Sequence, residues 1–141
     1  MAGTLSDYLE LELLDHVFGN AAYSAPATIY FGLWTAALTD VSTGAAANEV
    51  PNTNGYARQS LTNNLTNFPA ASGGAKSNGV AITGWAAAGG NWGTVTHLGC
   101  LDSGTYGAGN MLAWCDLTVS KTINNGDTAQ IAIGDFDVLL T

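Results

Sequence analysis

Positive charge is scarce in this sequence. The 141 residues include three lysines or arginines against eleven aspartates and glutamates, so the formal net charge is −8 at pH 7. A protein that binds nucleic acid neutralises phosphates with clustered cationic side chains, and Arg58, Lys76 and Lys121 are too few for such a patch. The charge balance therefore excludes nucleic acid as an expected partner, and the same acidity disfavours anionic membranes.

Charged residues of both signs are also few. They make up 10% of the chain, against about 25% in an average globular protein. Alanine, glycine, threonine, serine and asparagine must therefore cover much of the surface. Soluble monomers usually intersperse lysine and glutamate over their surface. A neutral surface of this kind indicates that part of it is covered in an assembly.

Long apolar runs are missing, and cysteine is rare. No stretch reaches the roughly 18 uninterrupted apolar residues of a membrane span, and residues 1–4 do not resemble the start of a secretion signal. We therefore expect neither a membrane span nor a secretion signal. The two cysteines, Cys100 and Cys115, lie in runs that we predict to be neighbouring strands. Two buried free thiols are the favoured interpretation, with a cross-strand disulfide as the alternative.

Motifs that carry catalysis or hold cofactors are missing too. His16 and His97 are far apart and have no metal-ligand spacing, and there is no G-x-S-x-G turn or phosphate-binding loop. Asp135 and Asp137 could offer oxygen ligands to calcium, but solvated edge carboxylates are the favoured interpretation. We predict a protein that is not an enzyme and uses no metal or other cofactor.

One segment near the N-terminus is strongly helical in pattern. Thr4 and Asp7 have capping-box spacing, and Gly19-Asn20 is a typical stop, so we predict a helix over residues 4–19. At about 100° per residue its apolar side chains form two neighbouring patches. Either both patches are buried in the domain, or one contacts a neighbouring subunit. These candidate interface residues are Leu9, Leu13 and Val17 in one patch, and Leu11, Leu14 and Phe18 in the other.

The sequence after residue 26 is typical of a β domain, with short β-branched and aromatic runs between Gly, Asn and Pro clusters. The pattern predicts one domain over residues 1–141, in which the helix precedes a two-sheet β-sandwich over residues 26–141. Its topology is jelly-roll-like or immunoglobulin-like. The predicted strands are 27–37, 56–61, 79–83, 94–101, 111–115, 117–123, 128–133 and 136–140.

Three connections have distinctive patterns. The Asn-Gly turn at residues 124–127 lies between alternating runs, which predicts that 117–123 and 128–133 form a hairpin. Residues 38–55 and 63–78 are longer than ordinary connections, which suggests binding loops or arms. The break near residue 115 is either a bulge or a strand end.

Four tryptophans are many for a chain of this length. Core filling explains Trp34 and Trp114. Trp85 and Trp92 bracket a run of small residues, where an aromatic side chain can anchor a loop or contact a partner. We add Trp85 and Trp92 to the candidate interface, with packing over a loop base as the alternative.

An ordered series of short blocks runs through nearly the whole chain. The blocks are residues 5–10 (LSDYLE), 13–19 (LLDHVFG), 22–30 (AYSAPATIY), 33–36 (LWTA), 55–59 (GYARQ), 92–97 (WGTVTH), 112–114 (LAW), 120–122 (SKT) and 125–127 (NGD). This series resembles a family of small structural proteins of tailed bacteriophages, often labelled tail-fibre-like. The resemblance implies a non-enzymatic, virion-associated role and no catalytic residues. The sequence departs from the family pattern mostly within residues 63–90.

We therefore expect a phage virion structural protein, made in the host cytoplasm. The leading hypothesis is a capsid decoration (cement) protein that binds the major capsid protein on the outside of the head and stabilises the shell by mass action. A single compact domain without a repetitive shaft favours this. The alternative is a small tail-fibre or tail-tip protein for host recognition, with other tail proteins or a host surface glycan as partners. Self-association as a dimer or trimer is expected, with the trimer favoured.

Overall fold

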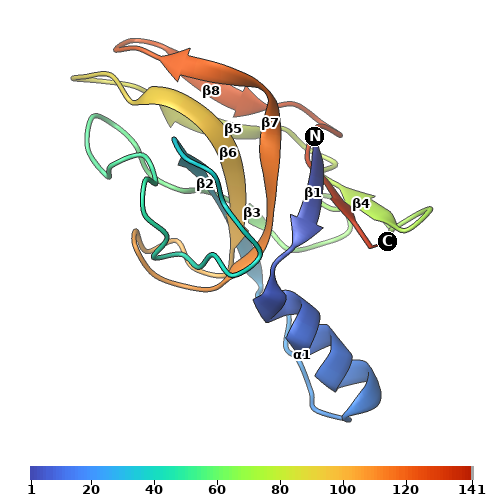
Figure 1. The fold of residues 1–141 in the computed structure, drawn as a ribbon. Coiled ribbons are helices and arrows are strands. Elements are labelled where there is room, and N and C mark those ends of the chain that lie inside the picture. Colours follow the sequence, from blue (N-terminus) through green and yellow to red (C-terminus); the bar gives the residue numbers. More distant parts are fainter. Residues whose placement is uncertain (141) are drawn as a thin grey trace.

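Residues 1–140, which the computed structural model describes, form nine strands and one helix (Figure 1). The longest strands, β2, β6 and β7, coincide with runs rich in apolar and β-branched residues. In chain order the elements are β1 (Ala2–Leu5), α1 (Asp7–Phe18), β2 (Thr28–Trp34), β3 (Gln59–Thr62), β4 (Ala75–Ser77), β5 (Ile82–Ala86), β6 (Gly93–Leu101), β7 (Met111–Ile123), β8 (Thr128–Ile131) and β9 (Asp137–Leu139).

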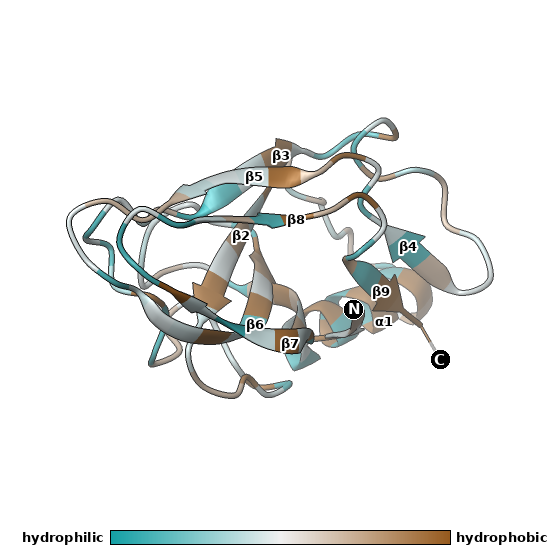
Figure 2. Cartoon of the chain, turned by 90° about the horizontal axis from the view of Figure 1, so that it is seen from above, coloured by the Kyte–Doolittle hydropathy of each residue, from teal (hydrophilic) through white to brown (hydrophobic). Residues whose placement is uncertain are grey.

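Two sheets make up the β domain. Seven strands form a curled sheet in the order β3-β2-β6-β7-β1-β9-β4, and β5 pairs with β8 in a small second sheet. The β1–β9 pair is parallel and the other pairs are antiparallel. Figure 2 shows β5 and β8 in a layer above β2, β6 and β7. The prediction of a mainly β, sandwich-like fold with one helix near the N-terminus is confirmed.

The main core lies between these layers. Side chains from β2 and β6 meet those from β5 and β8, because alternate residues of each strand point to the same face. Phe31 on β2 is fully buried, and its ring contacts Phe136 edge-on at a centroid distance of 5.5 Å. The other large buried side chains of this core include Leu33, Ile82, Trp85, Val95, Leu98, Ile123 and Ile131.

The hairpin prediction is wrong, although its turn is present. Asp127 N–H donates to Asn124 O at 3.0 Å, and Gly126 has a φ of 92°. The two flanking strands belong to different sheets, since β7 pairs with β6 and β1 while β8 pairs with β5. Ala87 explains the outcome: its N–H donates to Asp127 O at 2.9 Å and its carbonyl accepts from Gly126 N–H at 2.8 Å. The turn is thereby held against the end of β5 and carries the chain from one sheet to the other.

Some predicted boundaries also differ. Residues 111–123 form one strand, and its register with β6 shifts between the Asp116 and Lys121 pairs, so the break near residue 115 is an irregularity within a strand and not a strand end. The strand predicted at 79–83 lies three residues later, and the predicted loop 63–78 contains β4. Residues 38–55 are a loop as expected. Residue 141, the last of the predicted sandwich, lies outside the described residues.

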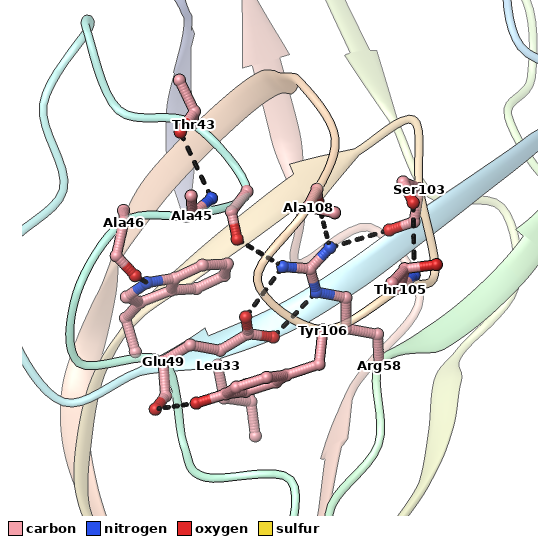
Figure 3. A network of polar contacts seen from close by, with 12 residues as sticks. Leu33, Thr43, Ala45, Ala46, Glu49, Arg58, Ser103, Thr105, Tyr106 and Ala108 are labelled. Atoms are coloured by element: carbon pink, nitrogen blue, oxygen red, sulfur yellow. Dashed lines mark hydrogen bonds and ion pairs between the residues drawn. The ribbon is translucent and has the colours of Figure 1, made fainter.

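A buried ion pair between Arg58 and Glu49 lies at the loop-rich end of the sandwich (Figure 3). Arg58 Nε donates to Glu49 Oε1 and Nη2 donates to Oε2, each at 2.8 Å. The side chains of Arg58 and Glu49 are 1% and 2% exposed. Such a two-pronged pair is strong and directional, and it compensates two charges that would be costly to bury alone.

The other guanidinium hydrogens of Arg58 bind the backbone of two loops. Nη1 donates to Ser103 O and Ala108 O, and Nη2 donates to Gly44 O, each at 2.8 Å. All five N–H donors of the side chain are thus used. The loops approach so closely that a Cβ on Gly44 would lie 1.9 Å from Ala108 O, which only glycine permits. One side chain therefore ties the loop of residues 38–55 to the β6–β7 connection.

Tyr56 joins this network to the central sheet. Its hydroxyl donates to Glu49 Oε1 at 2.9 Å and accepts from Leu33 N–H on β2 at 2.9 Å. Burial raises the pKa of the Tyr56 hydroxyl, and the neighbouring Glu49 carboxylate raises it further. The hydroxyl therefore remains a neutral donor to Glu49 at neutral pH.

We expect Glu49→Gln to reduce the free energy of unfolding by about 3–5 kcal/mol, because it leaves the buried Arg58 charge without its counterion. Asp116→Asn is the matched control: Asp116 lies 2.7 Å from His97 Nε2, but its side chain is 75% exposed. The control should lose less than about 1 kcal/mol. Urea unfolding measures both values, and equal losses would contradict the assigned role of the buried pair.

Candidate assembly surface on the N-terminal helix

Ser6, which is fully buried, is the N-cap residue that precedes helix α1. The Ser6 hydroxyl accepts the N–H of Leu9 at 3.3 Å and donates to Met111 O. Ser6 N–H also donates to Leu112 O at 3.1 Å. A serine N-cap satisfies a free amide of the first turn, and here the same side chain attaches the helix to the start of β7.

The predicted helix start at residue 4 is therefore wrong. Thr4 belongs to β1, where it pairs with Trp114 of β7, and its backbone is committed to the sheet. The predicted end is close to the observed one. Gly19 N–H donates to Asp15 O at 2.8 Å, and the chain then turns back alongside the helix, where Tyr23 N–H donates to His16 Nδ1 at 3.2 Å.

The helix projects from one end of the β domain (Figure 1). Its base has a further attachment, because Asp7 N–H donates to Asp40 O at 2.9 Å. Tyr8, Leu9 and Leu13 are partly buried and pack against the main core. These contacts on one side and at the base fix the direction in which the opposite side of the helix faces.

The first predicted patch is therefore split between two environments. Leu9 and Leu13 pack on their own domain, whereas Val17 is 65% exposed. Val17 lies in the last turn of the helix, one turn beyond Leu13. Within that patch, only Val17 is available to a partner.

The second predicted patch faces solvent. Leu11, Leu14 and Phe18 are 63%, 55% and 84% exposed. At about 100° per residue they lie within an arc of about 60°, with Glu10 and Asp15 about 40° beyond its two sides. We call these three apolar residues the outer ridge. A cluster of large apolar side chains that is held in place yet exposed is typical of an interaction surface.

Trp85 and Trp92 do not belong to an exposed surface, and their assignment to the candidate interface is corrected. They are 1% and 5% exposed and lie in the main core. Trp92 Nε1 donates to Asn54 O at 2.9 Å, so this side chain anchors the loop of residues 38–55 from inside. Trp85 packs between the sheets, and its buried Nε1 has no hydrogen-bond partner among the described residues.

The candidate disulfide and calcium-binding residues do not form a site in the described part of the chain. Cys100 and Cys115 are buried free thiols; burial raises the pKa of both, that of Cys115 to about 12. Asp137 accepts a hydrogen bond from Ser77, while Asp135 is exposed. Within residues 1–140, no three His, Cys, Asp or Glu side chains are grouped so that they could hold a metal ion. No helix in this part of the chain is long and apolar enough to cross a membrane.

The fold and the outer ridge define a small β-sandwich protein that presents one firmly based helix with an exposed apolar face. A family model described as "Podophage GP4 fiber I protein gp80" matches residues 4–139. Because the match spans nearly the whole chain, the protein belongs to this family of phage virion structural proteins. The resemblance seen in the sequence blocks is thereby confirmed. A comparison with curated proteins found no match.

The two buried tryptophans should differ in their response to phenylalanine. Trp92→Phe removes the hydrogen bond to Asn54, whereas Trp85→Phe removes a buried N–H that has no partner in residues 1–140. Both variants lose ring volume, so we expect Trp92→Phe to be the more destabilising by about 1–3 kcal/mol. Thermal or urea unfolding of the pair tests this, and the reverse order would contradict the assigned environments.

Proposed function

We propose that this chain is a subunit of a tail fibre of the phage particle, attached to the particle through the outer ridge of α1. The observation that carries the proposal is the family match, because the matching family model is described as a podophage fibre protein. In this proposal the chain has a structural role and no catalytic step. Its proposed partners are other tail proteins and further copies of itself, as a dimer or trimer with the trimer favoured.

The helix supports the attachment half of the proposal. Apolar side chains add affinity when a partner removes them from water, at about 25 cal/mol per Å² of buried apolar surface. The outer ridge is already ordered by the contacts of Ser6 and of the inner face, so binding would require little further ordering of the backbone. A subunit that must be held in a particle gains from both properties.

Capsid decoration is the second candidate. The observation that favours it is the single compact domain, because a fibre shaft is usually long and repetitive, and no repeat occurs in this sequence. Many copies of a small domain could bind capsomer junctions through weak contacts that add by multivalency. The ridge would then contact the major capsid protein.

Immunogold electron microscopy of intact particles, with antibody raised against this chain, separates the two candidates. We expect gold at the tail and its appendages. Gold distributed over the whole head would contradict the fibre proposal and make decoration the working function. Particles that lack the chain provide the control for antibody specificity.

A further inference from the structure

We propose that the outer ridge docks in an apolar groove with a cationic rim on a different virion protein, and not on a second copy of this chain. The inference rests on the proposed function, because it assigns the chemistry of the partner at that same attachment surface. It follows from the charges on α1 and from the small number of cations in the chain.

The spacing of the ridge fits recognition of a helix in a groove. Leu11, Leu14 and Phe18 are related as i, i+3 and i+7, which is the spacing of the anchor side chains that such grooves accept. Phe18 is the most exposed large hydrophobic residue of the three, at 84%. Its position in the last turn of α1 allows it to enter a pocket in the partner's groove.

The carboxylates of α1 indicate which charge the rim of the partner's groove must carry. Helix α1 contains four of them, at Asp7, Glu10, Glu12 and Asp15, and no lysine or arginine. Asp7 is exposed in line with the ridge, one turn before Leu11, and Glu10 and Asp15 are exposed on its two sides. A partner that covers the ridge brings its own rim against both sides. Lysine or arginine side chains there would pair with these carboxylates, while acidic ones would repel them.

A second copy of this chain is a poor match for that requirement. Of its three cationic side chains, Arg58 is buried with all its donors engaged. Lys76 lies on β4, where its ammonium group donates to Pro69 O at 3.1 Å, and among the described residues it is the single charged residue lining an apolar groove between β4 and α1. Lys121 is exposed on β7, but the apolar groove that it lines also carries the exposed carboxylate of Asp135. Neither groove therefore offers a lysine or arginine to each of the two carboxylates that flank the ridge. Two ridges packed together would also oppose their own flanking carboxylates, a repulsion that is specific to this surface.

The test is binding of the purified full-length chain to phage particles assembled without it, measured by co-sedimentation over a series of salt concentrations. Leu14→Ser/Phe18→Ser removes apolar ridge contacts, and we expect at least a tenfold weaker affinity. Glu10→Gln/Asp15→Asn keeps side-chain size and removes both flanking charges. For this variant we expect about three- to thirtyfold weaker binding at low salt, with a shallower salt dependence than the wild type.

Matched controls isolate the ridge from general changes. Val119→Ser changes an apolar side chain that is 78% exposed on β7, and Glu12→Gln/Asp135→Asn removes the same number of charges outside the two sides of the ridge. Both controls should bind within about twofold of the wild type, as expected for changes outside the contact. Circular dichroism and thermal unfolding confirm that all variants are folded.

Three outcomes would overturn the inference. Unchanged or tighter binding by Glu10→Gln/Asp15→Asn would exclude a cationic rim. Unchanged binding by the Leu14 and Phe18 double variant would exclude the ridge as the docking surface. If sedimentation velocity showed that the ridge variants dissociate an oligomer of the wild-type chain, the ridge would be a self-interface. Failure of the tail-fibre assignment is a separate result, because it would be seen as gold over the head while ridge-dependent binding persists.

Discussion

The buried pair of Arg58 and Glu49 is the interaction on which the arrangement of the loops depends. Its guanidinium group fixes carbonyl oxygens in the loop of residues 38–55 and in the β6–β7 connection, neither of which has a regular ladder of its own. Tyr56 extends the same network to β2. In a chain with so few charges, this fully hydrogen-bonded pair orders the long loops together with the hydrogen bonds of Trp34 to Ala46 O and of Trp92 to Asn54 O.

The residues that Arg58 binds lie close in sequence to the residues that hold the base of helix α1. Ser103 and Ala108, which Arg58 binds, precede the carbonyls of Met111 and Leu112 that receive the hydrogen bonds of Ser6. Asp40, which accepts from Asp7 N–H, belongs to the loop held through Gly44 O. One attachment of α1, from Asp7 to Asp40, therefore uses a loop that the ion pair orders, while Ser6 attaches the helix to β7. This links a buried electrostatic interaction to a surface suited to assembly.

Local patterns predicted most elements of the fold, but they missed β1 and β4 and did not predict the pairing. The alternation and β-branched content of residues 27–37 and 94–101 predicted β2 and β6, and the Asn-Gly signal predicted a real turn. The partners of β7 and β8 depend on contacts between distant segments, here the two hydrogen bonds of Ala87, and no local pattern encodes them. The capping-box spacing misplaced the helix start for the same reason, because pairing with β7 determines the conformation of residue 4.

The candidate surface was predictable in part. Periodicity separated two apolar patches on the helix, but only the structure shows that the core takes Leu9 and Leu13 and leaves Leu11, Leu14 and Phe18 outside. The tryptophans were assigned from small neighbouring residues, a signal that does not report burial.

A cryo-electron microscopy reconstruction of the particle that resolves this chain tests the central claim most directly. The account predicts that the outer ridge is covered by a different protein, with lysine or arginine nitrogens within about 4 Å of Glu10 and Asp15. A ridge that faces solvent, or that packs on another copy of the chain, would contradict it.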